Sequence, residues 1–234
     1  MADVGTVTAF YGRLARAYDL VATHTPGVPA IRRRAVAALD LHPGDTVVEM
    51  GCGTGANLPY LREQIGAEGC VVGIDLTPGM LARARNRVAR NGWRNVHLAR
   101  GDAGDPPVER ADAVLATFVV GMLPDPAAAV RRWESLVPGG RVALVDATRS
   151  NRPSARPLNG VFRAFVTLTT PPVGRLRYDE PPAGLLDRRV ASARESLARH
   201  GELTVDESLA LGFVRLSAAT VASTPDDRRS RPRR

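Results

Sequence analysis

The feature that most constrains the fold of this chain is a glycine-rich loop between an apolar run and a helical segment. Thr46–Met50 is short and rich in Val, which predicts a buried strand, and Gly51, Gly53 and Gly55 follow it directly. Ala56–Ile65 then has the pattern of a helix. A strand, a glycine loop and a helix in this order let the backbone approach a ligand closely and direct helix N–H groups at an anion. The loop therefore predicts a ligand site in an α/β sheet.

Further strand-like runs alternate with helical segments after this loop. Strands are expected at Cys70–Asp75, Val96–Asp102, Ala111–Val119 and Arg141–Thr148, and helices from Pro78, over Pro126–Leu136 and over Asp187–His200. This alternation predicts a parallel sheet with helices on both faces. Two final strands that meet around Leu211 and Gly212 are expected to form a hairpin.

The two ends of the chain differ from its middle. Residues 1–44 are expected to form a helical N-terminal cap, with helices around Thr8–Ala22 and Pro29–Leu39. Residues 45–222 are expected to form the main domain, with a mobile, proline-rich insertion at about 150–185 that builds the acceptor site. Residues 223–234 are rich in Arg and Pro, so we expect a disordered basic tail.

Three acids lie at the carboxyl ends of three consecutive predicted strands. Glu49 would repel the pyrophosphate of a nicotinamide cofactor but suits an ammonium, unless it simply caps the strand end. Asp75 can accept from ribose hydroxyls in either kind of cofactor, and Asp102 can accept from an adenine amino group. A ligand with an ammonium, a ribose and an adenine fits all three positions.

These motifs resemble those of the class I S-adenosylmethionine (SAM)-dependent methyltransferases. The resemblance covers about residues 8–220 through VVEMGCGTG, VVGIDLTPGML, ARGDA and LVPGGRVALVDA. It implies a Rossmann-like, seven-stranded α/β sheet of order 3-2-1-4-5-7-6 with the last strand antiparallel, and SAM as the cofactor. The cofactor-binding residues that we infer from it are Tyr11, Tyr18, Glu49, Gly51, Cys52, Gly53, Gly55, Asp75, Leu76, Met80, Asp102, Ala103 and Thr117.

The N-terminal stretch AFYGRLARAYDLV is similar to the opening of the ubiquinone/menaquinone C-methyltransferases and of bacterial phospholipid N-methyltransferases. The similarity rests on Phe10, Tyr11, Ala15, Tyr18 and Asp19, although the two tyrosines could equally form a packed helix face. It implies a small or lipophilic acceptor: a quinone precursor, a phosphatidylethanolamine-like lipid or a secondary metabolite. The run LATFVVGM lacks the Asn/Asp-Pro-Pro-aromatic motif of base and glutamine N-methyltransferases, which argues against a nucleic-acid substrate.

Methyl transfer needs a general base only when the acceptor must lose a proton. His24 and Tyr178 are the candidates, and the alternative for each is a loop position that has no chemical role. The two Cys and the scattered His predict no metal site.

The basic charge of the chain is carried by Arg alone, which favours a GC-rich genome over nucleic-acid binding as its origin. Arg32–Arg34, the tail and the apolar stretch 161–168 could contact an anionic membrane. The alternative is a solvated helix face and a lid over the active site.

No signal peptide or membrane span is evident in the sequence, so a cytoplasmic enzyme is expected, with peripheral membrane contact as an option. The rival functions are an NAD-dependent oxidoreductase and a non-catalytic SAM-binding module. The oligomeric state is left open.

Overall fold

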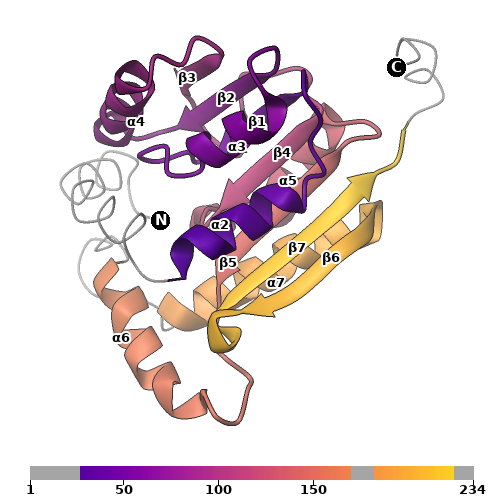
Figure 1. Ribbon diagram of the computed structural model, residues 1–234. Coiled ribbons are helices and arrows are strands. Elements are labelled where there is room, and N and C mark those ends of the chain that lie inside the picture. The colour runs from indigo at the N-terminus through magenta and orange to yellow at the C-terminus, as the bar shows by residue number, and fades with distance from the viewer. Residues whose placement is uncertain (1–26, 170–181, 224–234) are drawn as a thin grey trace.

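The described fold is a single seven-stranded sheet with helices on both faces (Figure 1). The computed structural model describes residues 27–169 and 182–223. The strands are β1 Thr46–Met50, β2 Cys70–Asp75, β3 Val96–Arg100, β4 Ala113–Thr117, β5 Arg141–Ala147, β6 Gly201–Leu209 and β7 Val214–Val221. Their order is β3-β2-β1-β4-β5-β7-β6, and β7 runs antiparallel to both neighbours. The predicted fold class, strand order and terminal hairpin are confirmed.

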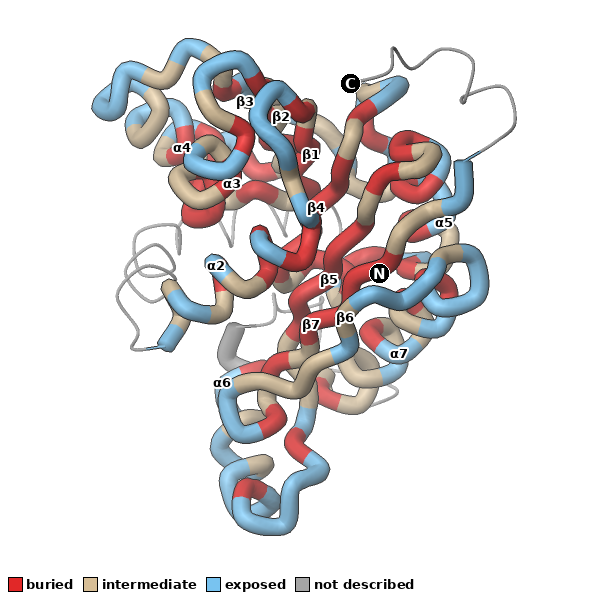
Figure 2. The backbone as a smooth tube through the Cα atoms, turned by 45° about the vertical axis from the view of Figure 1, so that its right-hand side comes forward, coloured by how far each residue is buried: buried red, intermediate tan, exposed pale blue. Residues whose placement is uncertain are grey.

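The helices form two layers, each packed on its own apolar cluster. On one face lie α2 Val28–Ala37, α3 Leu58–Ile65 and α4 Pro78–Arg90; on the other lie α5 Pro126–Leu136 and α7 Pro182–His200. Since strand side chains alternate between faces, Val47 packs with the first layer and Val48 with the second. Figure 2 shows the resulting continuous buried core through the central strands.

Several predicted boundaries differ from the observed ones. The strands predicted over Val96–Asp102 and Ala111–Val119 end at Arg100 and Thr117, where the chain turns away from the sheet. The helix predicted to start at Asp187 begins at Pro182 instead, because proline is well tolerated in a first helical turn.

The proline-rich segment predicted as an insertion contains regular structure. A short 3₁₀ turn, η2 (Arg156–Leu158), leads into α6 (Asn159–Thr169), which extends beyond the carboxyl end of β5 (Figure 1). Residues 170–181, the first predicted helix and almost all of the predicted basic tail lie outside the described residues.

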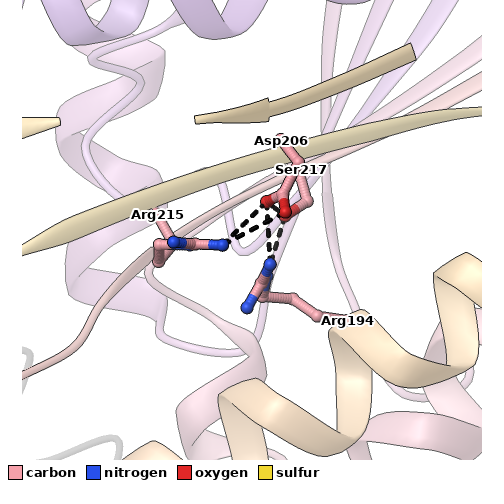
Figure 3. Close-up of polar contacts among 4 residues, drawn as sticks. All are labelled: Arg194, Asp206, Arg215 and Ser217. Carbon is pink, nitrogen blue, oxygen red and sulfur yellow. Dashed lines mark hydrogen bonds and ion pairs between the residues drawn. The ribbon is translucent and has the colours of Figure 1, made fainter. Parts of the chain in front are cut away.

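A charged cluster fastens α7 to the terminal hairpin. The Asp206 carboxylate accepts hydrogen bonds from Arg194 Nη2 at 2.7 Å, from Arg215 Nη2 at 3.1 Å and from Ser217 Oγ at 3.1 Å (Figure 3). These groups come from β6, α7 and β7, so three elements meet at one carboxylate. The last strands are thereby tied to the helix that covers them.

Candidate cofactor site at the carboxyl edge of the sheet

The glycine loop leaves β1 at the carboxyl edge, in backbone conformations that favour glycine. Gly51, Gly53 and Gly55 have φ values of 61°, 55° and 75°. At Gly51 a Cβ atom would also lie 2.3 Å from Cγ2 of Val119, the second residue after β4. Glycine is therefore required at Gly51 both by the backbone conformation and by the close approach of the loop to the segment after β4.

Glu49 is buried just before this loop, and one of its two carboxylate oxygens accepts no hydrogen bond from the described residues. Its side chain accepts from Asn57 Nδ2 at 2.6 Å through Oε1, while Oε2 is buried with no hydrogen-bond partner in the described structure. Burial raises the pKa of Glu49 to about 7, against the lowering influence of Asn57 and Arg32. A buried, unpartnered carboxylate oxygen is costly, so this geometry suits a ligand that brings a cationic donor.

Asn57 connects Glu49 to two further elements. Its Nδ2 also donates to Thr117 Oγ1 at 3.0 Å, at the end of β4, and its Oδ1 accepts from Arg32 Nη1 at 2.6 Å. Helices α2 and α3 pack on the same sheet face, which brings these side chains together. Neither Asn57 nor Arg32 was expected in the site from the sequence; the only signal for Asn57 is a polar residue at the start of an otherwise apolar helix face.

Asp75 holds the glycine loop against the end of β2. Its two carboxylate oxygens accept from Gly53 N at 2.8 Å and Thr77 N at 2.7 Å. Burial raises the pKa of Asp75, and these backbone hydrogen bonds oppose the shift. The side chain is half-buried, and each carboxylate oxygen can accept a second donor, so it remains available to a ligand.

The other described cofactor candidates lie near the same edge but differ in exposure. Asp102 is exposed and accepts from Gly104 N at 2.8 Å. The Ala103 carbonyl accepts from Trp133 Nε1 at 2.7 Å. Cys52 and Met80 are buried, so their side chains belong largely to the core at this edge.

The segment after β4 approaches the loop in a strained conformation. Phe118 has a φ of 59°, unusual for a bulky residue, and its N–H donates to the Val145 carbonyl at 2.7 Å. The 3₁₀ turn η1 (Val120–Met122) follows and packs under α7, where Arg189 Nη1 donates to the Gly121 carbonyl at 3.0 Å. Backbone strain of this kind is concentrated at functional sites.

The structure brings some of the predicted residues together and does not describe others. Glu49, the three glycines, Asp75 and Thr117 meet at the carboxyl ends of β1, β2 and β4. Leu76 lies directly after β2 and is half-buried, and the remaining candidates lie outside the described residues: Tyr11, Tyr18, His24 and Tyr178.

The basic run on α2 does not form one continuous face, because its three arginines differ in burial and in partners. Arg32 is buried. Arg33 lies over the ring of Tyr60, and the distance from its Cζ to the ring centroid is 5.4 Å. Arg34 forms an ion pair with Glu207 of β6. Arg32 therefore belongs to the core, whereas Arg33 and Arg34 contact other side chains at the surface of the protein.

The sequence also matches a known family over its central part. Residues 47–140, which include the glycine loop, match the family model described as a methyltransferase domain.

Curated relatives have related names. Aklanonic acid methyltransferase DauC of Streptomyces sp. (strain C5) is 38% identical over 117 residues, which are 49% of this chain and 53% of the relative. Nocamycin O-methyltransferase of Saccharothrix syringae is 36% identical over 57% of this chain and 48% of its own. A demethylmenaquinone methyltransferase of Listeria monocytogenes is 29% identical over 62% of this chain and 61% of the relative. The aligned part of this chain thus spans about half the length of the first two relatives.

Solved structures share the fold over nearly the whole chain. A SAM-dependent methyltransferase from Aquifex aeolicus aligns over 92% of this chain and 98% of its own, with a TM-score of 0.58 and 18% identity. The [4+2]-cyclase SpnF aligns over 92% of this chain and 97% of its own, with a TM-score of 0.62 and 14% identity. The match over residues 47–140 and the strand order make this chain similar to the class I SAM-dependent methyltransferases, whose fold it shares.

Proposed function

We propose that this protein transfers the methyl group of SAM to a small organic acceptor of low polarity. The observation that carries the proposal is Oε2 of Glu49, which is buried beside the glycine loop at the end of β1 and has no hydrogen-bond partner among the described residues. The methionine part of SAM carries an ammonium, which supplies the cationic donor that this oxygen lacks. The pyrophosphate of a nicotinamide cofactor would instead bring negative charge toward a buried carboxylate.

The remaining residues fit the rest of the cofactor. Glu49 and the loop Gly51–Gly55 would hold the methionine part, Asp75 the ribose, and Asp102 with Ala103 the adenine. Cys52, Leu76, Met80, Thr117, Tyr11 and Tyr18 complete the proposed binding set. When bound, SAM supplies an electrophilic methyl group on a sulfonium.

The protein's own contribution to such a transfer is mainly orientation. Holding an acceptor in line with the reacting carbon and excluding water is worth about 7–11 kcal/mol. We propose that the strained turn at Phe118 and η1, which packs under α7, form one wall of the acceptor site. If the acceptor must lose a proton, we propose His24 or Tyr178 as the base.

The proposed acceptor class rests on apolar side chains and on relatives' names. Leu186 of α7 packs against Gly121 of η1, and Met122 of the same turn is exposed. Two relatives are named for aklanonic acid and nocamycin and one for demethylmenaquinone. A quinone precursor, a phosphatidylethanolamine-like lipid or a secondary metabolite would each suit such a site.

A lipid acceptor would also give α6 a role. Leu158 of η2 and Val161 and Phe165 of α6 are exposed apolar side chains, and Arg156 and Arg163 are exposed in the same segment. We propose peripheral contact with an anionic membrane here only in combination with a lipid or quinone acceptor. Within the described residues, no helix has both the length and the apolar character needed to cross a membrane.

The function is tested by transfer of labelled methyl from SAM into a cell extract, followed by solvent partition. Label in the organic phase supports a lipid or quinone acceptor and the membrane contact, whereas label in the aqueous small-molecule fraction supports a polar metabolite. The fold alone does not determine methyl transfer, since a protein named as a [4+2]-cyclase shares it. The absence of label from every fraction despite tight SAM binding would therefore favour a protein that binds SAM without methyl transfer.

A further inference from the structure

Helix α2 reaches the candidate site through a buried arginine. Arg32 has 5% of its surface exposed, although its neighbours Arg33 and Arg34 lie toward the surface. Its Nη1 donates to Asn57 Oδ1 at 2.6 Å, and Asn57 Nδ2 donates to Glu49 Oε1 at 2.6 Å. A guanidinium and a carboxylate are thus joined through one amide in the core of the protein.

The amide of Asn57 can lie only one way in this arrangement. Its oxygen faces a donor that has no acceptor capacity, and its nitrogen faces a carboxylate and the Thr117 hydroxyl. Glu49 is consequently held by Oε1, which leaves Oε2 as its open atom. The orientation of the cofactor-facing oxygen therefore depends on a residue of α2.

We propose that Arg32 and Asn57 are positioning residues that keep Glu49 ionised and present its Oε2 to the ammonium of the cofactor. Helix α2 would then be part of the cofactor site and not merely a cover on the sheet. This inference rests on the proposed function, because it assumes that Glu49 receives that ammonium.

The charges around Glu49 make the inference measurable. Burial and the charge of Asp75 raise the pKa of Glu49, while Asn57, Arg32 and Arg87 lower it, with a result of about 7. A protonated carboxyl cannot pair with an ammonium as a carboxylate does. Near neutral pH, binding should therefore drive the Glu49 proton into the solvent, and affinity should depend on pH.

The experiment is calorimetric titration of S-adenosylhomocysteine between about pH 5.5 and pH 8.5. We expect the wild-type affinity to rise with pH and to level off above a midpoint near the pKa of Glu49, about 7. In Arg32→Met, which keeps an apolar stem but removes the charge, the midpoint should move up by about one pH unit. Affinity at neutral pH would then fall roughly fivefold, with the difference shrinking at high pH.

Three further variants separate positioning from folding. Arg34→Gln removes the ion pair of the same helix with Glu207 and should leave the midpoint unchanged. Arg32→Lys retains a positive charge and should keep the midpoint close to the wild-type value. Asn57→Ala, which removes the hydrogen bond to Glu49, should raise the midpoint even if Arg32→Met does not fold. Because the same ligand is used with every variant, any protonation change of the ligand affects all the affinities equally and does not alter the differences between the midpoints.

Equal midpoints in wild type and Asn57→Ala, or a shift as large in Arg34→Gln as in Arg32→Met, would overturn the proposal. A uniform loss of affinity at every pH in Arg32→Met would do the same, because it would show only a structural role. If the wild-type protein does not bind the ligand at any pH, the proposed function itself fails.

Discussion

At the scale of single residues, the cofactor site depends on a few positions where one side chain fits and chemically similar ones do not. Gly51 is such a position, since its φ of 61° disfavours any side chain and an added Cβ would lie 2.3 Å from Val119 Cγ2. Glu49 is another, because its buried oxygen has no partner among the described residues and a cationic ligand would offset that cost.

Replacement of Gly51 by Ala should destabilise the protein more than the backbone conformation alone explains. Gly92 has a similar φ of 64°, but no atom of the described residues lies within 4 Å of the position of a Cβ, so Gly92→Ala measures the conformational cost alone, about 1–2 kcal/mol. Gly51→Ala adds the clash with Val119, and we expect at least twice the loss in thermal unfolding experiments. Equal losses in the two variants would contradict the close approach of the loop to the segment after β4.

Asp146 provides a second prediction at this scale. It is buried on β5, and burial raises its pKa to about 8, although Arg194 and the Val120 N–H favour its ionised form. The native state therefore holds a proton that the unfolded chain releases. Its stabilising contribution is full below the ordinary pKa of an Asp and is lost as the pH rises through about 8.

Asp146→Asn should remove this pH dependence, because the amide oxygen can still accept from Val120. We expect the melting temperature of the variant, relative to wild type, to increase steadily between about pH 4 and pH 8. The increase should be roughly 2–4 °C for each kcal/mol of unfolding free energy that the wild-type protein loses over this range. A difference that stays constant over this range would show that Asp146 does not change its protonation there.

At the scale of elements, the network around Asp206 ties the terminal hairpin to α7. The partly buried carboxylate carries some desolvation cost, which raises its pKa, but the charges of Arg194 and Arg215 produce a net lowering. Its contribution to stability is therefore present above the ordinary pKa of an Asp and is lost as the pH falls through the lowered value.

Asp206→Asn should weaken the docking of α7 and lower the free energy of unfolding by about 1 kcal/mol, since the group is partly exposed and screened by solvent. Glu195→Gln is the matched control, because it removes an exposed ion pair with Arg199 within α7 alone and should cost about 0.3–0.5 kcal/mol. Denaturant unfolding at neutral pH measures both. A cost for Asp206→Asn no greater than that of the control would contradict a role in joining the elements.

The elements of the sheet could be predicted closely because their signals are local. Thr46–Met50 and Cys70–Asp75 are short apolar runs bounded by turn residues, and the structure confirms both ranges. Segment 150–185 was predicted less well, because prolines interrupt its apolar pattern and conceal α6 and the first turn of α7. Tertiary packing, which a local pattern does not contain, decides such segments.

The same distinction applies to the site. The acids Glu49 and Asp75 could be identified because they end predicted strands. The burial of Arg32 could not, since it depends on where α2 packs on the sheet and on the position of Asn57 at the start of α3. Three consecutive arginines suggest a basic surface until the fold places one of them in the core.

At the scale of the whole molecule, the site is assembled from four segments that are distant in sequence. Arg32, Glu49, Asn57 and Thr117 come from α2, β1, the start of α3 and β4, and they meet only in the folded sheet. A ligand held by this set binds the native state alone, so it should also raise the stability of the native state.

The proposed cofactor site is best tested by calorimetric binding of S-adenosylhomocysteine at about pH 8, where Glu49 is largely ionised. We predict binding by wild type, an affinity at least about tenfold lower for Glu49→Gln, and no binding of NADH. Glu134→Gln is the control, because Glu134 is also buried with an unpartnered oxygen but lies in the last turn of α5, and its affinity should match wild type. An affinity of Glu49→Gln within about threefold of wild type would contradict the assignment of Glu49 to the cofactor ammonium.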